Sequence, residues 1–132
     1  RILYYSFKFA FMSAAITCLI VEDEPLAMQL MEDYIRKLPM LHLKGKCYDA
    51  LEAMQWLKHQ KADVIFLDIN MPIWDGWDFL DEIVKLELQH AFEIYMVSSS
   101  TSLCDKEKAE SYPLIKGFLT KPLEIEALKL IL

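Results

Sequence analysis

The stretch Asp63-Val-Ile-Phe-Leu-Asp68 decides the fold, because it is a continuous apolar run with an aspartate at each end. Apolar residues on both faces are typical of a central strand in a parallel sheet, which helices cover on both sides. The turn-rich sequence Asn70-Met-Pro-Ile-Trp-Asp-Gly76 follows it closely. We therefore predict a buried strand over residues 63–68 that ends in a loop.

Apolar runs and amphipathic stretches alternate on both sides of this strand. The apolar runs predict four further strands, at residues 16–21, 41–47, 93–98 and 115–120. The stretches between them predict five helices. The first begins at Pro25 and ends before Pro39, the second begins after the capping residue Asp49, and the third begins at Gly76. The fourth covers residues 105–112 and the fifth covers residues 123–132, where it is truncated. In the third helix we expect Leu80, Ile83 and Val84 on the inner face. This alternation predicts an α/β fold, a doubly wound five-stranded parallel sheet with helices on both faces.

Composition limits the kind of molecule this is. The chain has 132 residues, of which 55% are hydrophobic, and a net charge of −6. This length predicts one globular domain, and the acidic balance argues against binding to nucleic acid or to a membrane surface. Cys18, Cys47 and Cys104 lie beside apolar residues without the spacing of a metal site. We expect them to be small buried side chains rather than disulfide partners.

The N-terminal residues are unusually apolar as far as Val21. About 20 apolar residues can span a bilayer, but Lys8 interrupts the run and residues 16–21 fit a buried strand better. We expect residues 1–14 to be an N-terminal extension or a segment left by cloning or by the gene start, with Met12 as a candidate start. A targeting segment is the remaining alternative, because Ser13-Ala-Ala15 resembles a cleavage site. The domain would then comprise residues 15–132.

Polar side chains follow the predicted strands at the points where they end. In chain order they are Glu22, Asp23, Asp68, Ser98 and Lys121. The carboxyl ends of the strands form the ligand site in such sheets, so we expect these groups to converge. Three clustered carboxylates need a compensating cation, and their oxygen atoms suit Mg²⁺. One carboxylate could attack phosphorus to form an aspartyl phosphate, while the lysine and the hydroxyl contact the phosphoryl oxygens.

These residues belong to four short motifs, Val21-Glu-Asp-Glu-Pro25, Leu67-Asp-Ile-Asn-Met-Pro72, Met96-Val-Ser98 and Lys121-Pro122. Their order resembles the receiver domain of bacterial two-component response regulators, with a likeness to chemotaxis regulators, over about residues 16–132. The resemblance implies a flavodoxin-like fold with strand order 2-1-3-4-5. It also implies that Asp68 accepts a phosphoryl group and that Lys121, joined to Pro122 by a cis peptide bond, contacts this group. The implied ligands of Mg²⁺ or Mn²⁺ are Glu22, Asp23, Asp68 and the backbone carbonyl of Asn70.

The resemblance further implies a switch made of Ser98, which would move toward the phosphoryl group, and Phe118, whose ring would turn inward. The face of the fourth helix, fifth strand and fifth helix would then bind a partner or a second copy of the chain as a homodimer. The implied phosphoryl donor is a sensor histidine kinase or a histidine phosphotransfer protein in the cytoplasm. Such a domain is no turnover enzyme, since it catalyses only its own phosphorylation and dephosphorylation. Its output would lie in a DNA-binding domain after Leu132 or in stand-alone partner binding.

Other readings of the same residues fit less well. A phosphohydrolase similar to haloacid dehalogenases requires Asp-x-Asp, whereas this sequence has Asp68-Ile-Asn70. A nucleotide site at the strand that ends at Asp68 would require a glycine-rich phosphate loop. A pseudo-receiver would lack part of the acidic set, the hydroxyl or the lysine. Trp74 and Trp77 are open to two interpretations, a partner surface or packing over the sheet.

Overall fold

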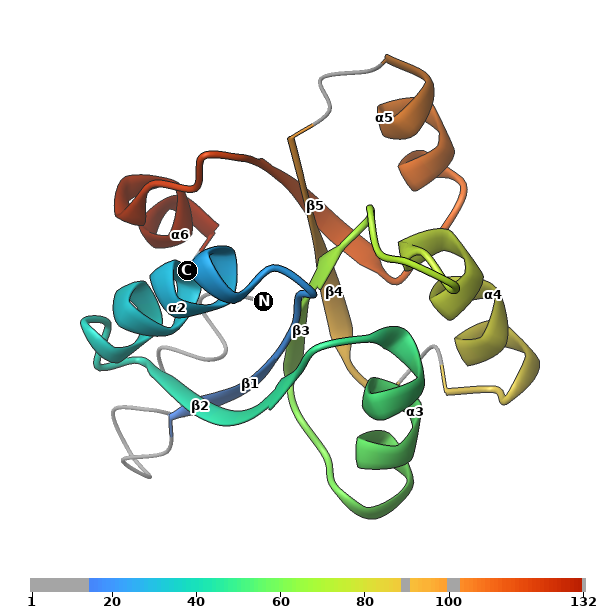
Figure 1. The fold of residues 1–132 in the computed structure, drawn as a ribbon, viewed down its shortest axis with the longest axis horizontal. Helices are drawn as coiled ribbons and strands as arrows, with labels where there is room; N and C mark the ends of the chain where they lie inside the picture. The colour runs from blue at the N-terminus through green and yellow to red at the C-terminus, as the bar shows by residue number, and fades with distance from the viewer. Residues whose placement is uncertain (1–14, 89–90, 100–102, 132) are drawn as a thin grey trace.

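The computed structural model describes residues 15–88, 91–99 and 103–131. Its five strands pair in parallel in the order β2-β1-β3-β4-β5, as Figure 1 shows. The strands are β1 (Ile16–Val21), β2 (Leu41–Cys47), β3 (Val64–Asp68), β4 (Glu93–Ser98) and β5 (Ile115–Thr120). The helices are α2 (Pro25–Arg36), α3 (Ala50–His59), α4 (Gly76–Lys85), α5 (Leu103–Glu110) and α6 (Ile125–Ile131). The predicted doubly wound sheet and its strand order are confirmed.

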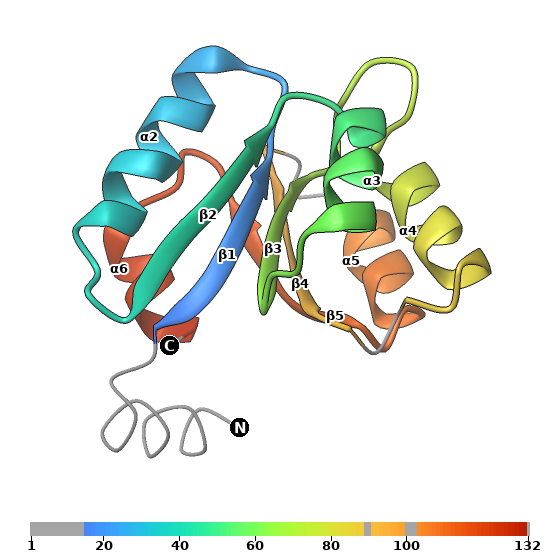
Figure 2. The same ribbon diagram turned by 90° about the horizontal axis from the view of Figure 1, so that it is seen from below.

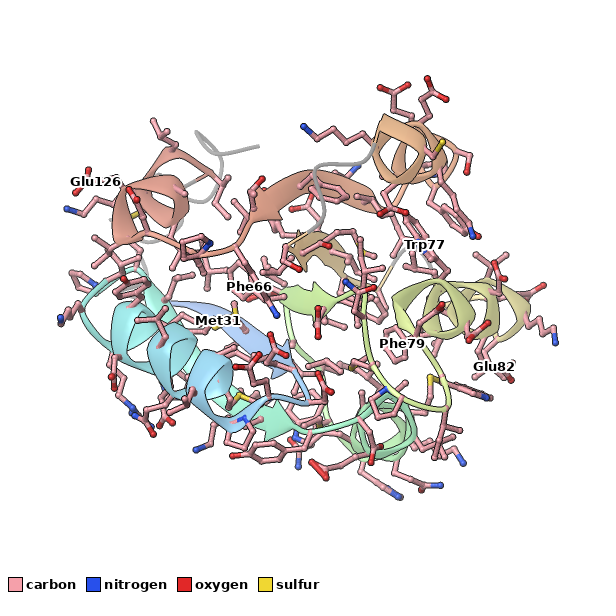
Figure 3. The ribbon with its side chains drawn as sticks, turned by 45° about the horizontal axis from the view of Figure 1, so that its top comes forward. Met31, Phe66, Trp77, Phe79, Glu82 and Glu126 are labelled. Atoms are coloured by element: carbon pink, nitrogen blue, oxygen red, sulfur yellow. The ribbon has the colours of Figure 1, made fainter. Side chains whose placement is uncertain are left out.

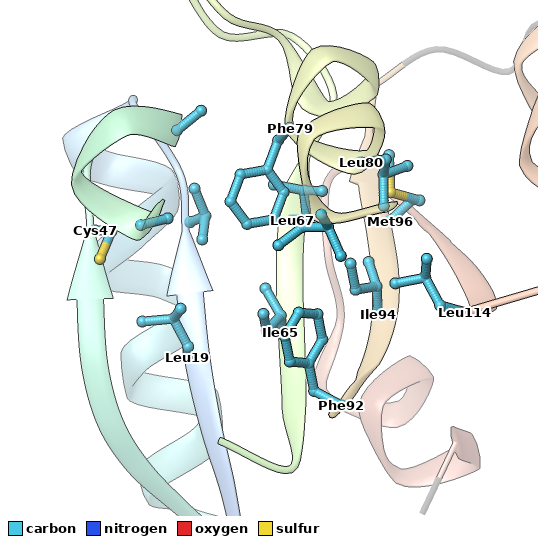
Figure 4. Packing of buried hydrophobic residues seen from close by; sticks show 14 of the residues in the cluster. Leu19, Cys47, Ile65, Leu67, Phe79, Leu80, Phe92, Ile94, Met96 and Leu114 are labelled. Atoms are coloured by element: carbon cyan, nitrogen blue, oxygen red, sulfur yellow. The ribbon is translucent and has the colours of Figure 1, made fainter. Parts of the chain in front are cut away.

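The helices form one layer on each side of the sheet. Figure 2 shows α2 and α6 on one face and α3, α4 and α5 on the other. All five residues of β3 are buried, and the first four alternate between two hydrophobic cores, one on each side of the sheet. Val64 and Phe66 pack on the side of α2 and α6, whereas Ile65 and Leu67 pack on the other side. In Figure 4, Leu67 lies close to Phe79, a fully buried residue of α4. The central position predicted for this strand follows from this double burial.

Local sequence signals place the starts of the helices that flank the carboxyl edge of the sheet. Pro25 is at the start of α2, where its missing N–H costs no hydrogen bond. The Asp49 carboxylate caps α3 by accepting the backbone N–H of Glu52 at 2.7 Å, as predicted. At the start of α4, Asp75 and Asp78 form a reciprocal capping box. The helix starts are therefore fixed beside the strand ends.

Two expectations about side-chain burial were wrong. Val84 is 43% exposed, because it follows the buried Ile83 by about 100° of helix rotation and turns away from the sheet. Cys104 is exposed on α5, a polar helix, whereas Cys18 and Cys47 are buried as expected. Helix α5 also begins and ends two residues earlier than predicted.

The predicted N-terminal extension, residues 1–14, lies outside the described residues. Among the helices formed by residues 15–88, 91–99 and 103–131, none combines the length and the apolar character needed to cross a membrane.

Candidate functional site

Three carboxylates meet at the carboxyl edge of the sheet. Glu22 and Asp23 directly follow β1, and Asp68 is the last residue of the neighbouring strand β3. One carboxylate oxygen from each residue lies within 4.8 Å of the others. Glu22 is 1% exposed and Asp68 is 3% exposed, while Asp23 is half-buried. The predicted acidic cluster is therefore present, and it lies mostly out of contact with water.

Backbone groups of the adjoining loops orient two of these carboxylates. Oε2 of Glu22 accepts the backbone N–H of Glu24 at 3.2 Å, and the Glu22 N–H donates to the Cys47 carbonyl at 3.0 Å. Oδ1 of Asp68 accepts the N–H of Asn70 at 3.2 Å. The loops after β1 and β3 therefore hold the carboxylates toward a common point.

Lys121 supplies a positive charge at this point from the end of β5. Its Nζ lies 2.6 Å from Oε1 of Glu22 and 3.4 Å from Oδ1 of Asp68. The backbone N–H of Lys121 donates to the carbonyl of Ser98 at 2.8 Å, which ties the end of β5 to the end of β4. The peptide bond to Pro122 is cis, as the resemblance implied. One ammonium thus contacts carboxylates from two different strands.

The electrostatics of the site are unbalanced, because three carboxylates face one ammonium. Burial raises the pKa of Asp68 to about 7, and the hydrogen bond and charge of Glu22 add to this, while Lys121 opposes it. Burial lowers the pKa of Lys121, but Glu22 and Asp68 outweigh it and raise the pKa above its usual value. The ammonium therefore keeps its proton, and the cluster still carries an excess of negative charge. A hard divalent cation would offset this excess, and carboxylate oxygens are the donor atoms that such a cation prefers.

The two predicted switch residues lie in different surroundings. Ser98 is fully buried at the end of β4, opposite Thr120 in the β5 register. Phe118 is half-buried on β5 and packs against the core under α3, α4 and α5. The structure thus gathers Glu22, Asp23, Asp68 and Lys121 at one point, links Ser98 to them through the backbone, and places Phe118 on the neighbouring core.

A groove of about 260 Å³ adjoins the site, and no sequence motif predicted it. It lies between the start of α2 and the loop after β5, with Leu26, Leu30, Pro122 and Leu123 in its lining and Lys121 at its border. Leu26 is 79% exposed. It lies off the buried stripe of α2, so helical periodicity identifies it only as a surface residue.

Comparison with known proteins identifies the family of the chain that carries this site. The family model described as the response regulator receiver domain matches residues 18–132. The chain belongs to this family. The receiver domain is a phosphoryl-accepting signalling domain, so the predicted family and general function are confirmed.

Relatives of this receiver domain include longer proteins. A protein-glutamate methylesterase/protein-glutamine glutaminase 2 of Pseudomonas aeruginosa is 37% identical over 108 residues, which cover 81% of this chain and 30% of the relative. An uncharacterized response regulatory protein of Shewanella oneidensis is 33% identical over 89 residues, covering 64% of this chain and 38% of that protein. The chain thus spans well under half the length of these relatives, and the activity in the first name is a property of that whole protein.

Solved structures show the same fold. A two component response regulator from Cytophaga hutchinsonii has a TM-score of 0.81 and 23% identity, covering 89% of this chain and 95% of that chain. The Vibrio cholerae chemotaxis protein CheY4 has a TM-score of 0.77 and 24% identity, covering 89% of this chain and 96% of that chain. At this identity the likeness supports the fold alone.

Proposed function

We propose that Asp68 of this receiver domain accepts a phosphoryl group from a phosphohistidine. The observation that carries the proposal is the burial of Asp68 beside two further carboxylates, with the Lys121 ammonium 3.4 Å from its Oδ1. An oxygen of the Asp68 carboxylate would form the new bond to phosphorus. The P–N bond to the donor imidazole would break, and the imidazole would leave with the electron pair and take up a proton.

The residues around Asp68 fit a divalent cation, Mg²⁺ or Mn²⁺. The proposed ligands are the carboxylates of Glu22, Asp23 and Asp68 together with the backbone carbonyl of Asn70. When bound, the cation would neutralise negative charge on the phosphoryl oxygens during transfer. Lys121 would contact another phosphoryl oxygen, and its present distance from Asp68 makes this a short movement.

Phosphorylation would act through Ser98 and Phe118. The Ser98 hydroxyl would turn to a phosphoryl oxygen, and the Phe118 ring would move inward as Ser98 vacates its place. Phe118 lies on β5 between α5 and α6, so its movement would change the face formed by these three elements. We propose that this face, the output face, binds a partner or a second copy of the chain.

A protein donor, either a histidine kinase or a histidine phosphotransfer protein, has an apolar surface to bind beside the acceptor. The groove next to Lys121 and the exposed Leu26 would receive apolar side chains of such a donor. The two-component family supports a cytoplasmic setting for this exchange.

We also propose that residues 15–132 form the receiver domain and that residues 1–14 are an extension. The domain would turn over no external substrate, and it would contact no DNA or lipid directly.

The test is incubation with a small phosphodonor such as acetyl phosphate and Mg²⁺, followed by intact mass measurement. The wild-type mass should rise by one phosphoryl group, and the mass of Asp68→Asn should stay unchanged. Equal labelling of both proteins would refute the role of Asp68. Sustained phosphate release from a generic monoester would instead support a hydrolase.

The proposed metal ligands can be tested without phosphorylation. Isothermal titration with MgCl₂ should give a binding isotherm for the wild type and a much weaker one for Asp23→Asn. Asp33→Asn, an exposed carboxylate on α2, is the matched control and should bind as the wild type does. Equal binding by all three proteins would contradict the proposed ligand set.

A further inference from the structure

Helix α5 carries little of its own apolar surface into the core. Its sequence, LCDKEKAE, is mostly charged, and Ala109 is the one buried residue among its described side chains, residues 104–110. A helix of eight residues is too short to be stable by propensity alone. Contacts that fasten α5 to the rest of the domain must therefore contribute strongly to its position.

Two side chains of α4 contact one side chain of α5 and one from the turn after α5. The ring of Trp77, near the start of α4, stacks on the ring of Tyr112 with centroids 5.8 Å apart and planes at 29°. Nζ of Lys108 lies 4.8 Å from the Trp77 ring centroid. The Tyr112 hydroxyl donates to Oδ1 of Asp81 at 2.6 Å. We call Trp77, Asp81, Lys108 and Tyr112 the clasp.

Both aromatic residues of the clasp are held in place by their contacts. Trp77 is 7% exposed, and Figure 3 places it between α4 and α5. The hydrogen bond to Asp81 raises the pKa of Tyr112 to about 12, so the phenol keeps its proton and donates throughout the neutral range. Of the two interpretations of Trp77, packing over the sheet rather than a partner surface is confirmed, because the Tyr112 ring and the Lys108 ammonium both cover its ring. Trp74 also packs partly buried against this core.

The clasp is continuous with the phosphoryl-acceptor loop at one end and with β5 at the other. Trp77 follows Gly76, whose N–H donates at 2.8 Å to the carbonyl of Ile69, the residue after Asp68. The carbonyl of Tyr112 accepts the N–H of Ile115, the first residue of β5, at 3.0 Å. The clasp therefore adjoins the loop that follows the acceptor aspartate through Gly76, and the start of β5 through Tyr112.

We propose that the clasp holds α5 against α4 and opposes the rearrangement of the output face. This inference rests on the proposed function, in which phosphorylation of Asp68 shifts that face. The two positions of α5 would differ in whether the clasp is closed. Weakening the clasp would shift the population toward the open position, and phosphorylation would do the same by reciprocal coupling.

The first test measures hydrogen exchange of the α5 amides in the unphosphorylated protein. Tyr112→Phe keeps the stacked ring but removes the hydrogen bond to Asp81, and Asp81→Ala removes the acceptor. Each variant should exchange α5 amides faster by about fivefold, the factor implied by one net hydrogen bond. The double variant should exchange no faster than the single variants, because both changes remove the same contact. Tyr48→Phe, a tyrosine 43% exposed at the start of α3, is the matched control.

Exchange in β1 and β3 separates a local effect from general destabilisation. If these strands keep wild-type exchange while α5 exchanges faster, the clasp is confirmed as the restraint on α5. Unchanged α5 exchange in Tyr112→Phe and Asp81→Ala would overturn the proposal. Equal acceleration in all elements would also overturn it, because the clasp would then only support global stability.

The second test asks whether phosphorylation acts through the clasp. Treatment with a small phosphodonor and Mg²⁺ should accelerate α5 exchange in the wild type, and by a clearly smaller factor in Tyr112→Phe, whose clasp is already weakened. An equal factor in both proteins would overturn the coupling. Absence of labelling at Asp68 would instead refute the proposed function and leave the first test to decide whether the clasp restrains α5.

Discussion

Replacing Gly76 by alanine should destabilise the domain, although alanine is the better helix former. Gly76 is the first residue of α4, and a Cβ there would lie 2.9 Å from the carbonyl oxygen of Asp68 and 3.0 Å from Cα of Ile69. Both atoms belong to backbone, so no side-chain rotation relieves the contact. The start of α4 must therefore move away from the end of β3.

The size of the effect follows from three contributions. Ordinary contact begins at 3.4 Å, so the helix must shift by several tenths of an ångström. Overpacking of this kind costs about 1–3 kcal/mol. The shift also weakens the Gly76 N–H bond to Ile69, which is worth about 1 kcal/mol. The gain in helix propensity returns at most about 1 kcal/mol. We expect a net loss of about 1–3 kcal/mol in the free energy of unfolding.

Urea unfolding followed by circular dichroism measures this loss, with Gly45→Ala as the comparison. A Cβ at Gly45 would meet the ring of Trp56, a half-buried side chain that can turn aside. We expect Gly45→Ala to lose less stability than Gly76→Ala. The reasoning is refuted if Gly76→Ala is as stable as the wild type, or if Gly45→Ala loses as much.

Three further predictions concern pH, thiol reactivity and helix capping. Hydrogen bonds from Lys46 and Arg36 hold the pKa of Glu32 below its usual value of about 4.5. A lowered pKa stabilises the fold above the unfolded value, and this contribution is lost as pH falls through the folded value. The stability difference between wild type and Glu32→Gln should therefore be constant above about pH 5 and shrink below pH 4.5 in urea unfolding. Iodoacetamide should alkylate the exposed Cys104 first in the native protein, because burial raises the pKa of both other thiols to about 12, as mass spectrometry would show. Asp49→Ala should cost about 1 kcal/mol in unfolding free energy by removing the cap of α3.

Each of these predictions has a clear contrary result. A stability difference for Glu32→Gln that is the same at pH 3 and pH 6 would show that its ion pairs do not stabilise the fold. Simultaneous alkylation of all three thiols in native protein would contradict the burial of Cys18 and Cys47. For the cap, Asp33→Ala on the exposed side of α2 is the matched control, and an equal loss there would remove the special role of Asp49.

The fold was predictable because most of its elements carry their own local signal. β3 is apolar on both faces, and only a strand between two helical layers can bury both. Proline and aspartate mark the starts of α2 and α3 without reference to distant residues. The errors at α5 arose because its local signal is weak. Helix α5 has no apolar stripe, so the bounds predicted from the sequence lie two residues too late, and the predicted burial of Cys104 is wrong.

The acidic site was predictable for a related reason, since parallel topology turns the position of strand ends in sequence into proximity in space. Glu22, Asp68 and Lys121 each come at the end of a strand, so they had to meet once the sheet was parallel. The clasp had no such signal. Contact between Trp77 and Tyr112 depends on the direction of two side chains across a helix interface, and neither periodicity nor strand order determines that direction.

The position of Lys121 also explains how the cluster of three carboxylates could accept a negatively charged phosphoryl group. Its ammonium is closer to Glu22, at 2.6 Å, than to Asp68, at 3.4 Å, so the proposed nucleophile is the less tightly paired of the two buried carboxylates. Burial raises the pKa of Asp68, and the hydrogen bond and charge of Glu22 add to this rise, so that together they outweigh the attraction of Lys121. A phosphoryl group on Asp68 would bring new anionic oxygens toward the ammonium and would compete with Glu22 for it. Lys121 is also the residue whose backbone N–H binds the Ser98 carbonyl, so the residue that would contact the phosphoryl oxygens lies beside the predicted switch serine. In the proposed function, phosphoryl transfer to Asp68 would thereby be linked to the residues at the ends of β4 and β5, next to the output face.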